Sequence, residues 1–581
     1  MTNPHHIRMA WGIFLCCILL PVRSMAHTSD IVPASYEEIN ILGELSQRVH
    51  KNFDRLEEQK YQPDHVFLTE QQSGDWPGDT EGRTILGLTL DAQASHRTPK
   101  YLDEIIRRIP SNLNQKGYMG TIHEGKAHEQ QLSGNGWLLR GLCEYYQWKG
   151  HPEVRKTIAG IAHNLFLEAA GQYASYPIDP DKRKQNVGAE SGSIAGIEGN
   201  WILSTDIGCV FIGMDGLIHA YAILKDKALK APIETLIDKF LKVDLTGIKA
   251  QTHATLTACR GLVRYAEITG ERRYIDEAAR RFRLYVDNGM TENYENYNWF
   301  DRFETWTEPC AIVDSYMLAM QLWQHTGEAY YLEQAERIYY NAICHTQRRN
   351  GGFGCDNCPG LTTNTTLLGV HADEAHWCCT MRGGEGLSCA VRYTCFKDKN
   401  GVYLTSFRPG RFITKRGRKS LLDFSVDTRY PFGSNVVITI NKSTAKPTSL
   451  HLPALSWIAD LKASLNGQEK NVTATNGFIT LTEKFKAGDK ITLTFRQRTG
   501  FEPVLNKNNT RSTWRRAFSG PLMLGMETNA PVSLPSDARY QQTGEQEWTI
   551  VGTGQKLTPV YHLMSPKVWS DGNYHKCILF Q

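Results

Sequence analysis

The chain has 581 residues, of which 41% are hydrophobic and 22% are charged, so it is too long for one hydrophobic core and predicts at least two domains. Its 65 basic and 61 acidic residues leave a formal charge of only +4 and are interleaved without long runs of one sign. This distribution excludes a polybasic membrane anchor and the basic footprint of a nucleic-acid-binding protein.

The N-terminus carries the pattern of a secretory signal peptide. Arg8 precedes an apolar run over residues 9–22, which ends at the small-x-small sequence Ser24-Met25-Ala26. We therefore predict a signal peptide over 1–26 and a periplasmic or secreted protein. Lipidation at Cys16 or Cys17 is the alternative, although neither follows the small residue that such a site needs. No later segment approaches the roughly 20 apolar residues of a membrane span, so no stable membrane insertion is expected.

Residues 27–395 are dominated by amphipathic helix patterns that form a loose repeat. In each unit a helix with a small-apolar pair is followed by a short polar turn and a second, charged helix. One hairpin cannot bury its own apolar face, so five or six such units predict a closed (α/α)6 six-hairpin barrel. The first helices would form its inner wall, and they carry Gly87-Leu88, Gly141-Leu142, Gly216-Leu217, Gly261-Leu262, Leu318 and Gly386-Leu387.

Residues 396–581 follow a different pattern, with short runs of β-branched and aromatic residues between Gly, Asn and Pro. Period-two alternation in residues 491–495 predicts antiparallel strands. The pairs Asn466-Gly467 and Asn476-Gly477 are typical of tight hairpin turns. We expect a C-terminal antiparallel β-sandwich packed closely on the barrel.

Some of the cysteines lie in apolar helical surroundings, where they predict ordinary core positions: Cys143, Cys209, Cys259 and Cys344. Cys355 and Cys358 are different, because Cys-x2-Cys is itself a metal-ligand spacing. A disulfide, free thiols in a surface loop and a second metal site all remain open for this pair.

Three islands of reactive residues stand out. The first holds Glu292, the second has Glu308 two residues before Cys310, and the third is the adjacent pair Cys378-Cys379. Three thiolates and one carboxylate can complete a tetrahedral zinc site. The spacing alone matches no common zinc-finger pattern.

These islands resemble the β-L-arabinofuranosidases of glycoside hydrolase family 127. The shared pattern is a glutamate 16 positions before Glu308-Pro309-Cys310-Ala311 and then Trp377-Cys378-Cys379. The resemblance extends into the β region and covers most of the mature chain through Tyr430-Pro431-Phe432, Leu452-Pro453-Ala454, Leu465-Asn466-Gly467, Ala487-Gly488-Asp489 and Ser519-Gly520-Pro521-Leu522.

The resemblance implies a retaining exo-glycosidase that removes a terminal L-arabinofuranose, or a related uncommon sugar, from a plant or algal polysaccharide. It implies that Zn²⁺ is bound by Glu308, Cys310, Cys378 and Cys379. Cys378 would attack the anomeric carbon, because a metal-bound thiol stays deprotonated. Glu292 would protonate the leaving oxygen, with Glu295 as the rival acid.

Three further residues are predicted to bind substrate. His253 resembles a sugar-binding histidine of the family. Trp137 stands where the family tends to have histidine, which replaces a hydrogen-bonding group by a stacking surface. Arg382 follows the cysteine pair in a segment that departs from the family, and its planar fork would suit the carboxylate of an acidic sugar. These departures leave the identity of the sugar open.

Two other functions remain open at the level of sequence. One is another (α/α)6 carbohydrate enzyme, an uronyl hydrolase or lyase, that uses Asp206, Asp215 or Glu292. The other is a noncatalytic glycan-binding protein. Phosphate-binding Gly loops, Gly-x-Ser-x-Gly elbows and His-Glu-x-x-His motifs do not occur in the sequence. We expect an oligosaccharide or polysaccharide partner and no nucleic acid, and the oligomeric state stays open.

Overall fold

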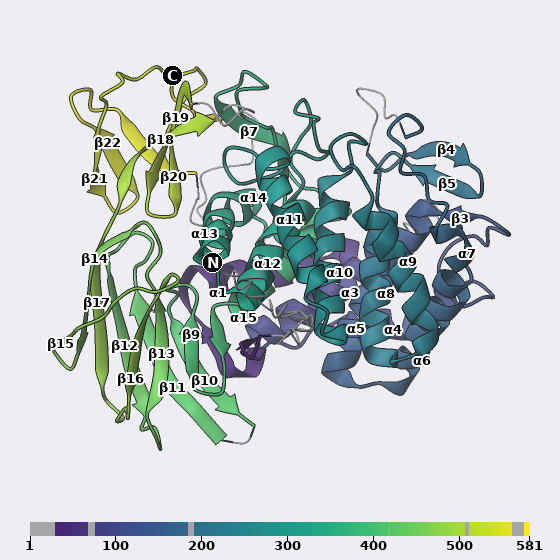
Figure 1. Cartoon of the computed structure of the whole chain (residues 1–581), viewed down its shortest axis with the longest axis horizontal. Coiled ribbons are helices and arrows are strands. Elements are labelled where there is room, and N and C mark those ends of the chain that lie inside the picture. Colours follow the sequence, from purple (N-terminus) through teal and green to yellow (C-terminus); the bar gives the residue numbers. More distant parts are fainter. Residues whose placement is uncertain (1–28, 68–75, 184–190, 418, 506–510, 561–574) are drawn as a thin grey trace, which may run out of the picture.

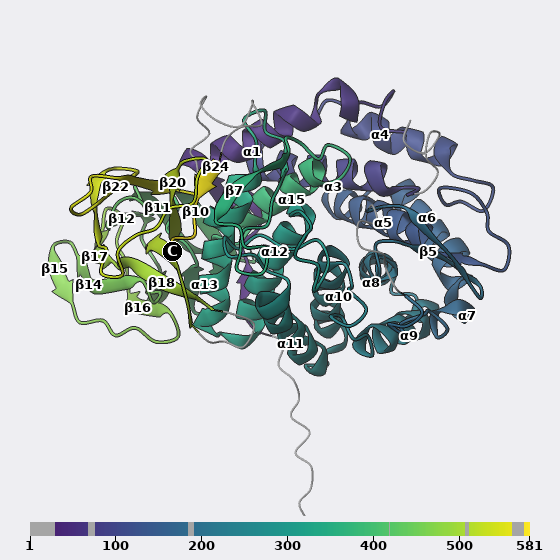
Figure 2. The ribbon, with the colours of Figure 1, turned by 90° about the horizontal axis from the view of Figure 1, so that it is seen from above.

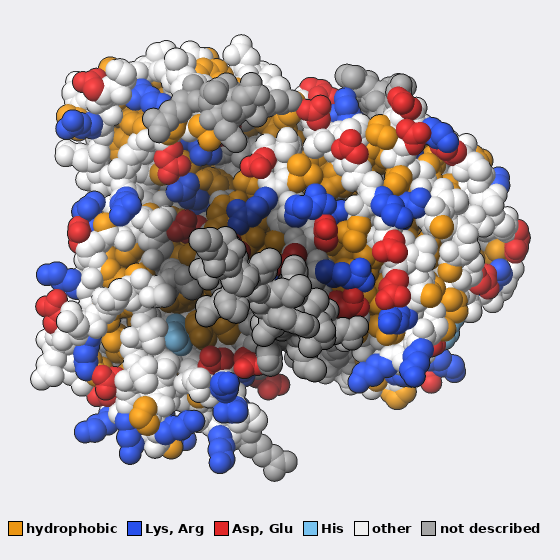
Figure 3. Space-filling model, viewed as in Figure 1, with side chains coloured by type: hydrophobic (Ala, Val, Ile, Leu, Met, Phe, Trp, Pro, Cys, Tyr) orange, Lys and Arg blue, Asp and Glu red, His pale blue; other side chains and the backbone are white. Residues whose placement is uncertain are grey.

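The computed structural model describes residues 29–67, 76–183, 191–417, 419–505, 511–560 and 575–581. A helical region and a strand-rich region lie side by side, with the C-terminus in the strand-rich part (Figure 1). The predicted signal peptide, residues 1–26, lies outside the described residues. No helix within the described ranges is long and apolar enough to cross a membrane. Acidic and basic side chains are interspersed over the face shown in Figure 3.

Six inner helices form a closed ring (Figure 2). Each packs against the next in chain order, and the last packs against the first. They are α3 (Asp79–Ser95), α5 (Glu129–Lys149), α8 (Val210–Leu224), α10 (Thr252–Thr269), α12 (Pro309–Thr326) and α15 (Cys379–Arg392). These are the helices whose small-apolar pairs predicted the inner wall.

Outer helices alternate with the inner ones along the chain: α1 (Gly43–Leu56), α4 (Leu102–Arg108), α6 (Pro152–Ile161), α9 (Lys230–Leu241), α11 (Arg273–Asn288) and α13 (Ala329–Ile338). In α11 the buried apolar residues recur at three and four, as a one-faced helix requires: Tyr274, Ile275, Ala278, Phe282 and Tyr285. The six-hairpin barrel predicted from the sequence is confirmed.

Glycines allow the inner helices to approach closely. A Cβ on Gly141 of α5 would lie 2.3 Å from the carbonyl oxygen of Gly82 of α3, and a Cβ on Gly216 of α8 would lie 2.3 Å from that of Gly136 of α5. No other residue fits such a distance, so the recurring glycine of the repeat reflects backbone contact between neighbouring helices.

The first part of the strand-rich region is a two-sheet sandwich. One sheet has the order β1-β8-β9-β13-β16 and the other β15-β14-β17-β12-β11-β10-β2. The strands after the barrel are β8 (Cys395–Lys397), β9 (Gly401–Leu404), β10 (Gly410–Arg416), β11 (Lys419–Thr428), β12 (Asn435–Lys442), β13 (Thr448–Pro453), β14 (Ile458–Leu465), β15 (Gln468–Lys470), β16 (Phe478–Glu483) and β17 (Lys490–Gln497). All pairs are antiparallel except β9 with β13.

Local sequence explains these strands. In β12 the alternate residues Val436, Ile438 and Ile440 are buried. Asn466 and Gly467, between β14 and β15, both have positive φ, as the predicted tight turn requires. The antiparallel C-terminal sheet region is therefore confirmed.

Strands from outside residues 396–581 also join these sheets. β1 (Val32–Pro33) pairs with β8, and β2 (Ile39–Ile41) pairs with β10. A further sheet contains β18 (Thr499–Leu505), β19 (Arg511–Ser519), β20 (Leu522–Glu527), β21 (Tyr540–Gly544), β22 (Glu547–Ile550), β23 (Lys556–Pro559) and β24 (His575–Cys577), and β24 pairs with β7 (Leu367–Ala372), which lies within the predicted barrel range. The two regions are therefore interlocked rather than joined end to end at residue 395.

Candidate active site

A pocket of about 470 Å³ lies where the inner helices begin. Its wall includes His253, the second residue of α10, Glu308, which immediately precedes α12, and Cys378 and Cys379 at the start of α15. Since an outer helix returns the chain between successive inner helices, the inner helices all run in the same direction, and side chains from their first turns meet at one end of the barrel.

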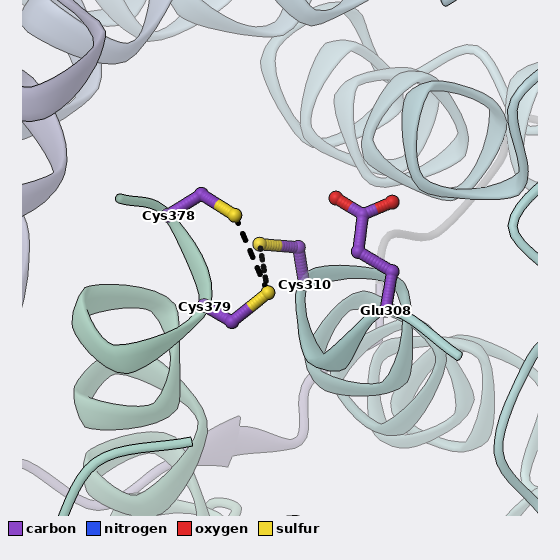
Figure 4. A group of neighbouring side chains, drawn as sticks. All are labelled: Glu308, Cys310, Cys378 and Cys379. Carbon is purple, nitrogen blue, oxygen red and sulfur yellow. Dashed lines mark hydrogen bonds between the residues drawn. The ribbon is translucent and has the colours of Figure 1, made fainter. Parts of the chain in front are cut away.

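Four of these side chains face a common space, with Cys310 and Glu308 from the start of α12 and Cys378 and Cys379 from the start of α15 (Figure 4). The sulfur of Cys379 lies 3.3 Å from that of Cys378 and 3.6 Å from that of Cys310. One oxygen of Glu308 and the three sulfurs all lie within 4.8 Å of one another. Tetrahedral zinc with bonds of about 2.3 Å to sulfur would separate two sulfurs by about 3.8 Å, so the cluster is close to that geometry.

The electrostatics of the cluster depend on a cation. Burial raises the pKa of Cys310 and of Cys379 well above the ordinary thiol value, so both thiols are neutral without one. Opposing this, the N-termini of α12 and α15 and the Arg83 guanidinium, 3.3 Å from the Cys310 sulfur, favour thiolates. Oε2 of Glu308 is buried without a hydrogen-bond partner. A soft divalent metal fits this donor set, whereas magnesium and calcium prefer oxygen ligands.

His253 positions the carboxylate of Glu308. Its Nδ1 lies 3.2 Å from Oε1 of Glu308, and its Nε2 lies 3.5 Å from Oδ2 of Asp314. Burial alone would raise the pKa of Asp314, but Arg382 and Arg260 hold it well below its usual range. The His253 ring therefore lies between two carboxylates, one of them a candidate metal ligand, although its Nε2 makes no hydrogen bond.

Trp137 and Arg382 lie beneath the pocket and not on its wall. Both are fully buried, and the Trp137 ring stacks on His253 with centroids 5.7 Å apart. Arg382 lies 4.5 Å from the Trp137 ring and is paired with Asp314 and Glu385. The expectation that these two side chains contact the sugar is therefore corrected, because two carboxylates already bind the guanidinium and His253 covers the indole.

Glu292 lines a second pocket, of about 540 Å³, together with Tyr294, Tyr297 and Arg516. Its Oε2 lies 3.1 Å from the Arg516 guanidinium. Burial raises the pKa of Glu292, and Arg516 partly offsets this. The structure thus brings together the four predicted ligands and His253, while Glu292 is not among the residues that line the cysteine pocket.

The other carboxylates considered as catalytic groups lie at three different positions. Glu295 is fully buried 3.9 Å from Nε2 of His345, which also lies 3.3 Å from Asp356. Asp215 is buried inside the ring, 3.3 Å from Arg140. Asp206, by contrast, is on the wall of the cysteine pocket.

Cys355 and Cys358 are free and buried, so of the alternatives left open for this pair neither the disulfide nor the exposed thiols of a surface loop is found. Cys355 begins strand β6 (Cys355–Asp356), lines the cysteine pocket and interacts with the Cys379 thiol. A fourth thiol therefore adjoins the ligand cluster.

Sequence reasoning missed much of the pocket wall. Trp76, Trp306 and Trp377 all line it, and Trp377 is 55% exposed. Only Trp377 gave a signal, through its position next to the cysteine pair. Trp76 and Trp306 come from segments that are far apart in the sequence, and no local pattern predicts that both line this pocket.

Two parts of the chain match models of known protein families. Residues 242–390 match the model of the GH127 catalytic domain of β-L-arabinofuranosidases, and residues 401–497 match the model of the GH127 middle domain. No curated protein matches the chain in sequence.

Solved structures agree in fold. A GH127 β-arabinofuranosidase superposes with a TM-score of 0.71 at 14% identity, covering 95% of this chain and 98% of its own. A GH127 β-L-arabinofuranosidase from Geobacillus stearothermophilus T6 gives a TM-score of 0.64 at 13% identity, covering 92% and 94%. The two domain models bear out the resemblance drawn from the sequence motifs, and the solved structures show that the fold is the same.

Proposed function

We propose that this glycoside hydrolase, whose residues 242–390 match the catalytic-domain model of that family, is a retaining exo-enzyme with Cys378 as nucleophile. Its substrate would be a terminal L-arabinofuranose, or a related uncommon sugar, on a plant or algal polysaccharide. The observation that carries this proposal is the convergence of three sulfurs and one carboxylate on a pocket of small-ligand size.

Glu308, Cys310, Cys378 and Cys379 would hold zinc, which keeps their thiols deprotonated at neutral pH when bound. Cys378 is the ligand best placed to react, since it is half-buried while Cys310 and Cys379 are fully buried. Its sulfur would attack the anomeric carbon, and water would then release the sugar from the thioglycosyl intermediate. Two displacements at one carbon give net retention of configuration.

The shape of the pocket supports action on chain ends. Three tryptophans, Trp76, Trp306 and Trp377, contribute to its wall, and aromatic rings are a common surface for binding sugars. The closed ring of inner helices blocks a long chain from passing through.

We also propose that the protein is exported, on the strength of the apolar run over residues 9–22 and the small-x-small sequence that follows it. N-terminal sequencing of the protein recovered from the producing cell would reveal cleavage after Ala26, and an intact Met1 in the cytoplasm would contradict the proposal.

The deciding experiment compares metal content and activity in the wild type and in Cys378→Ala. The matched control is Cys389→Ala, which removes a buried thiol from the far part of the same helix, α15. Substrates are 4-nitrophenyl β-L-arabinofuranoside and a pectin digest, and NMR of the first-formed product reports its configuration.

We expect about one zinc per chain in the wild type and the control, with metal weakened and activity lost in Cys378→Ala. A metal-free, active wild type, or an active Cys378→Ala variant, would overturn the thiolate mechanism. A hydrolase or lyase that depends on carboxylates would then explain the activity better.

A further inference from the structure

The carboxyl groups on the wall of the cysteine pocket differ in what already binds them. Among the described residues of the wall, these groups belong to Asp79, Asp206 and Glu308. Both oxygens of Asp79 are bound by the Arg83 guanidinium, at 2.6 and 3.1 Å. Glu308 belongs to the ligand cluster. Asp206 is therefore the carboxyl group of the wall that neither an arginine nor the ligand cluster engages.

Asp206 is held in one orientation by uncharged donors. It lies between β5 (Trp201–Ser204) and α8 and is only 4% exposed. The Ser191 hydroxyl lies 2.8 Å from Oδ1 and 3.0 Å from Oδ2, and the Gly192 N–H donates to Oδ2 at 3.1 Å. The backbone N–H of Asp206 donates to the Ser204 hydroxyl at 3.1 Å. The two carboxyl oxygens therefore keep fixed places at the pocket.

The groups that hold Asp206 are themselves fixed. The carbonyl oxygen of Gly192 accepts from Trp76 Nε1 at 3.1 Å and from Gln130 Nε2 at 3.0 Å. Gln130 Nε2 also lies 3.0 Å from the Ser204 hydroxyl, so one amide contacts both sides of the Asp206 cradle. A side chain supported in this way needs little reorganisation when it binds a ligand.

Asp206 has hydrogen-bonding capacity left for a ligand. A carboxylate offers about four acceptor positions on its two oxygens. From the described part of the chain, only the Ser191 hydroxyl and the Gly192 N–H donate to it, and the single hydroxyl proton can serve one oxygen at a time. About two acceptor positions therefore stay unfilled on a side chain that lines the pocket. A ligand that fills them must bring donors, as the hydroxyl groups of a sugar do.

We propose that Asp206 is a sugar-binding residue, which accepts from a hydroxyl group of the terminal sugar and so sets the specificity of the pocket for a neutral sugar. The inference rests on the proposed function, because it concerns the sugar whose bond this glycosidase breaks. Asp206 takes no part in the proton transfers of that reaction.

The charges of the pocket wall favour a neutral sugar over a uronic acid. Arg83 is the one guanidinium or ammonium group among the wall residues that the structure describes, and Asp79 binds it. The negative ligands of the cysteine cluster would outnumber the two positive charges of a zinc ion. A sugar carboxylate beside Asp206 would therefore be buried without a cationic partner, which is strongly unfavourable.

The test compares Asp206→Ala, which removes the acceptor, with Asp206→Asn, which keeps one acceptor oxygen. Asp226→Asn is the matched control, because Asp226 lies just beyond the far end of α8, contacts His163 and is not on the pocket wall. The sugar is the one that the wild type hydrolyses fastest from a panel of neutral and uronic acid 4-nitrophenyl glycosides. Each enzyme then receives that glycoside and its monodeoxy analogues, each of which lacks one hydroxyl group.

In the wild type we expect the loss of one particular hydroxyl to lower kcat/KM about 10- to 100-fold, the usual range for a hydrogen bond to a charged group. In Asp206→Ala this penalty should vanish for the same analogue, while the penalties at the other hydroxyls stay, because only that hydroxyl has lost its partner. Asp206→Asn should give an intermediate penalty, and Asp226→Asn should match the wild type. The wild type should hydrolyse the uronic acid glycosides at least about tenfold more slowly than the neutral one.

Two results would overturn the proposal. One is a set of deoxy penalties that is the same in Asp206→Ala and in the wild type at every position, even if all rates fall together, since a purely structural role lowers every rate alike. The other is a preference of the wild type for uronic acids. Zinc content and tryptophan fluorescence show whether Asp206→Ala keeps its fold, and if it does not, Asp206→Asn provides the comparison.

Failures of the two proposals remain separable. An active Cys378→Ala variant removes the thiolate mechanism, whereas the deoxy comparison is valid for whichever group attacks the sugar. If the wild type hydrolyses no glycoside of the panel, the same comparison is made on the affinities of the methyl glycosides, measured by calorimetry. Equal deoxy penalties on affinity in the wild type and Asp206→Ala would then overturn the role of Asp206, and a wild type that binds none of these sugars would overturn both proposals.

Discussion

Replacing Arg382 by methionine distinguishes support of the pocket floor from recognition of an acidic sugar. The unbranched side chain keeps apolar contact with Trp137 but removes the charge that pairs with Asp314 and Glu385. If the guanidinium is structural, the substitution should lower the free energy of unfolding. If it binds substrate, the substitution should lower kcat/KM selectively on the acidic sugar.

Breaking a buried ion pair by removing one partner costs about 3–5 kcal/mol. Neither carboxylate is left alone here, because Asp314 keeps Arg260 and the Thr257 hydroxyl at 2.6 Å. Glu385 keeps Arg140 at 2.5 Å and Arg260 at 3.1 Å. We therefore expect the free energy of unfolding to fall by about 3 kcal/mol, the lower end of that range.

Urea unfolding followed by tryptophan fluorescence measures this loss, with Arg155→Met on the exposed face of α6 as the control, expected within about 0.5 kcal/mol of the wild type. Activity is compared on one neutral and one uronic-acid glycoside, and kcat/KM should change by the same factor on both. A stability loss below about 1 kcal/mol, or a defect confined to the acidic substrate, would refute the structural role.

The remaining predictions concern the metal, the pocket mouth and the ring. His253→Ala should weaken zinc binding about 10- to 100-fold in a chelator competition, because Glu308 loses its orienting partner, and an unchanged affinity would contradict that role. Zinc affinity should fall with decreasing pH by about tenfold per unit for each thiol proton displaced, since burial raises the pKa of Cys310 and Cys379, and a flat pH profile would indicate ligands other than thiols. Trp377→Ala should raise KM more than it lowers kcat, as steady-state kinetics would measure, because an exposed ring at the pocket can stack on sugar. Gly216→Ala should lower the melting temperature, since its Cβ would lie 2.3 Å from the Gly136 carbonyl oxygen, and an unchanged melting temperature would mean that the helices can separate at no cost.

Local patterns were enough to predict the fold. The small-apolar pair recurs because neighbouring inner helices touch through their backbones at positions such as Gly141 and Gly216, so packing and sequence repeat have one cause. The Asn466-Gly467 turn was equally readable, because both residues must adopt positive φ.

The site was only partly predictable. The four candidate ligands were predicted from their chemistry and from the family resemblance, and both Cys310 and Cys379 fall in the first turn of a helix. The position of a residue next to a motif does not determine the direction in which its side chain points. Arg382 is four residues after Cys378, yet it points into the ring because Asp314, on another helix, binds it. Asp206 lies at the pocket beside Gly192, whose carbonyl oxygen accepts from Trp76 and Gln130, and no spacing rule connects these segments.

The pairing of the first strands with the sandwich has a consequence for how the chain folds. The Lys397 ammonium contacts the Glu38 carboxylate across 359 residues of sequence, beside the pairing of β2 with β10. Closing so long a loop is entropically costly, so we expect this docking to come late in folding. Until then β8 and β10 present bare sheet edges, which the same N-terminal segment of a second molecule could occupy. Exchange of residues 32–41 between two chains is therefore the natural route by which this enzyme would dimerise or aggregate during refolding.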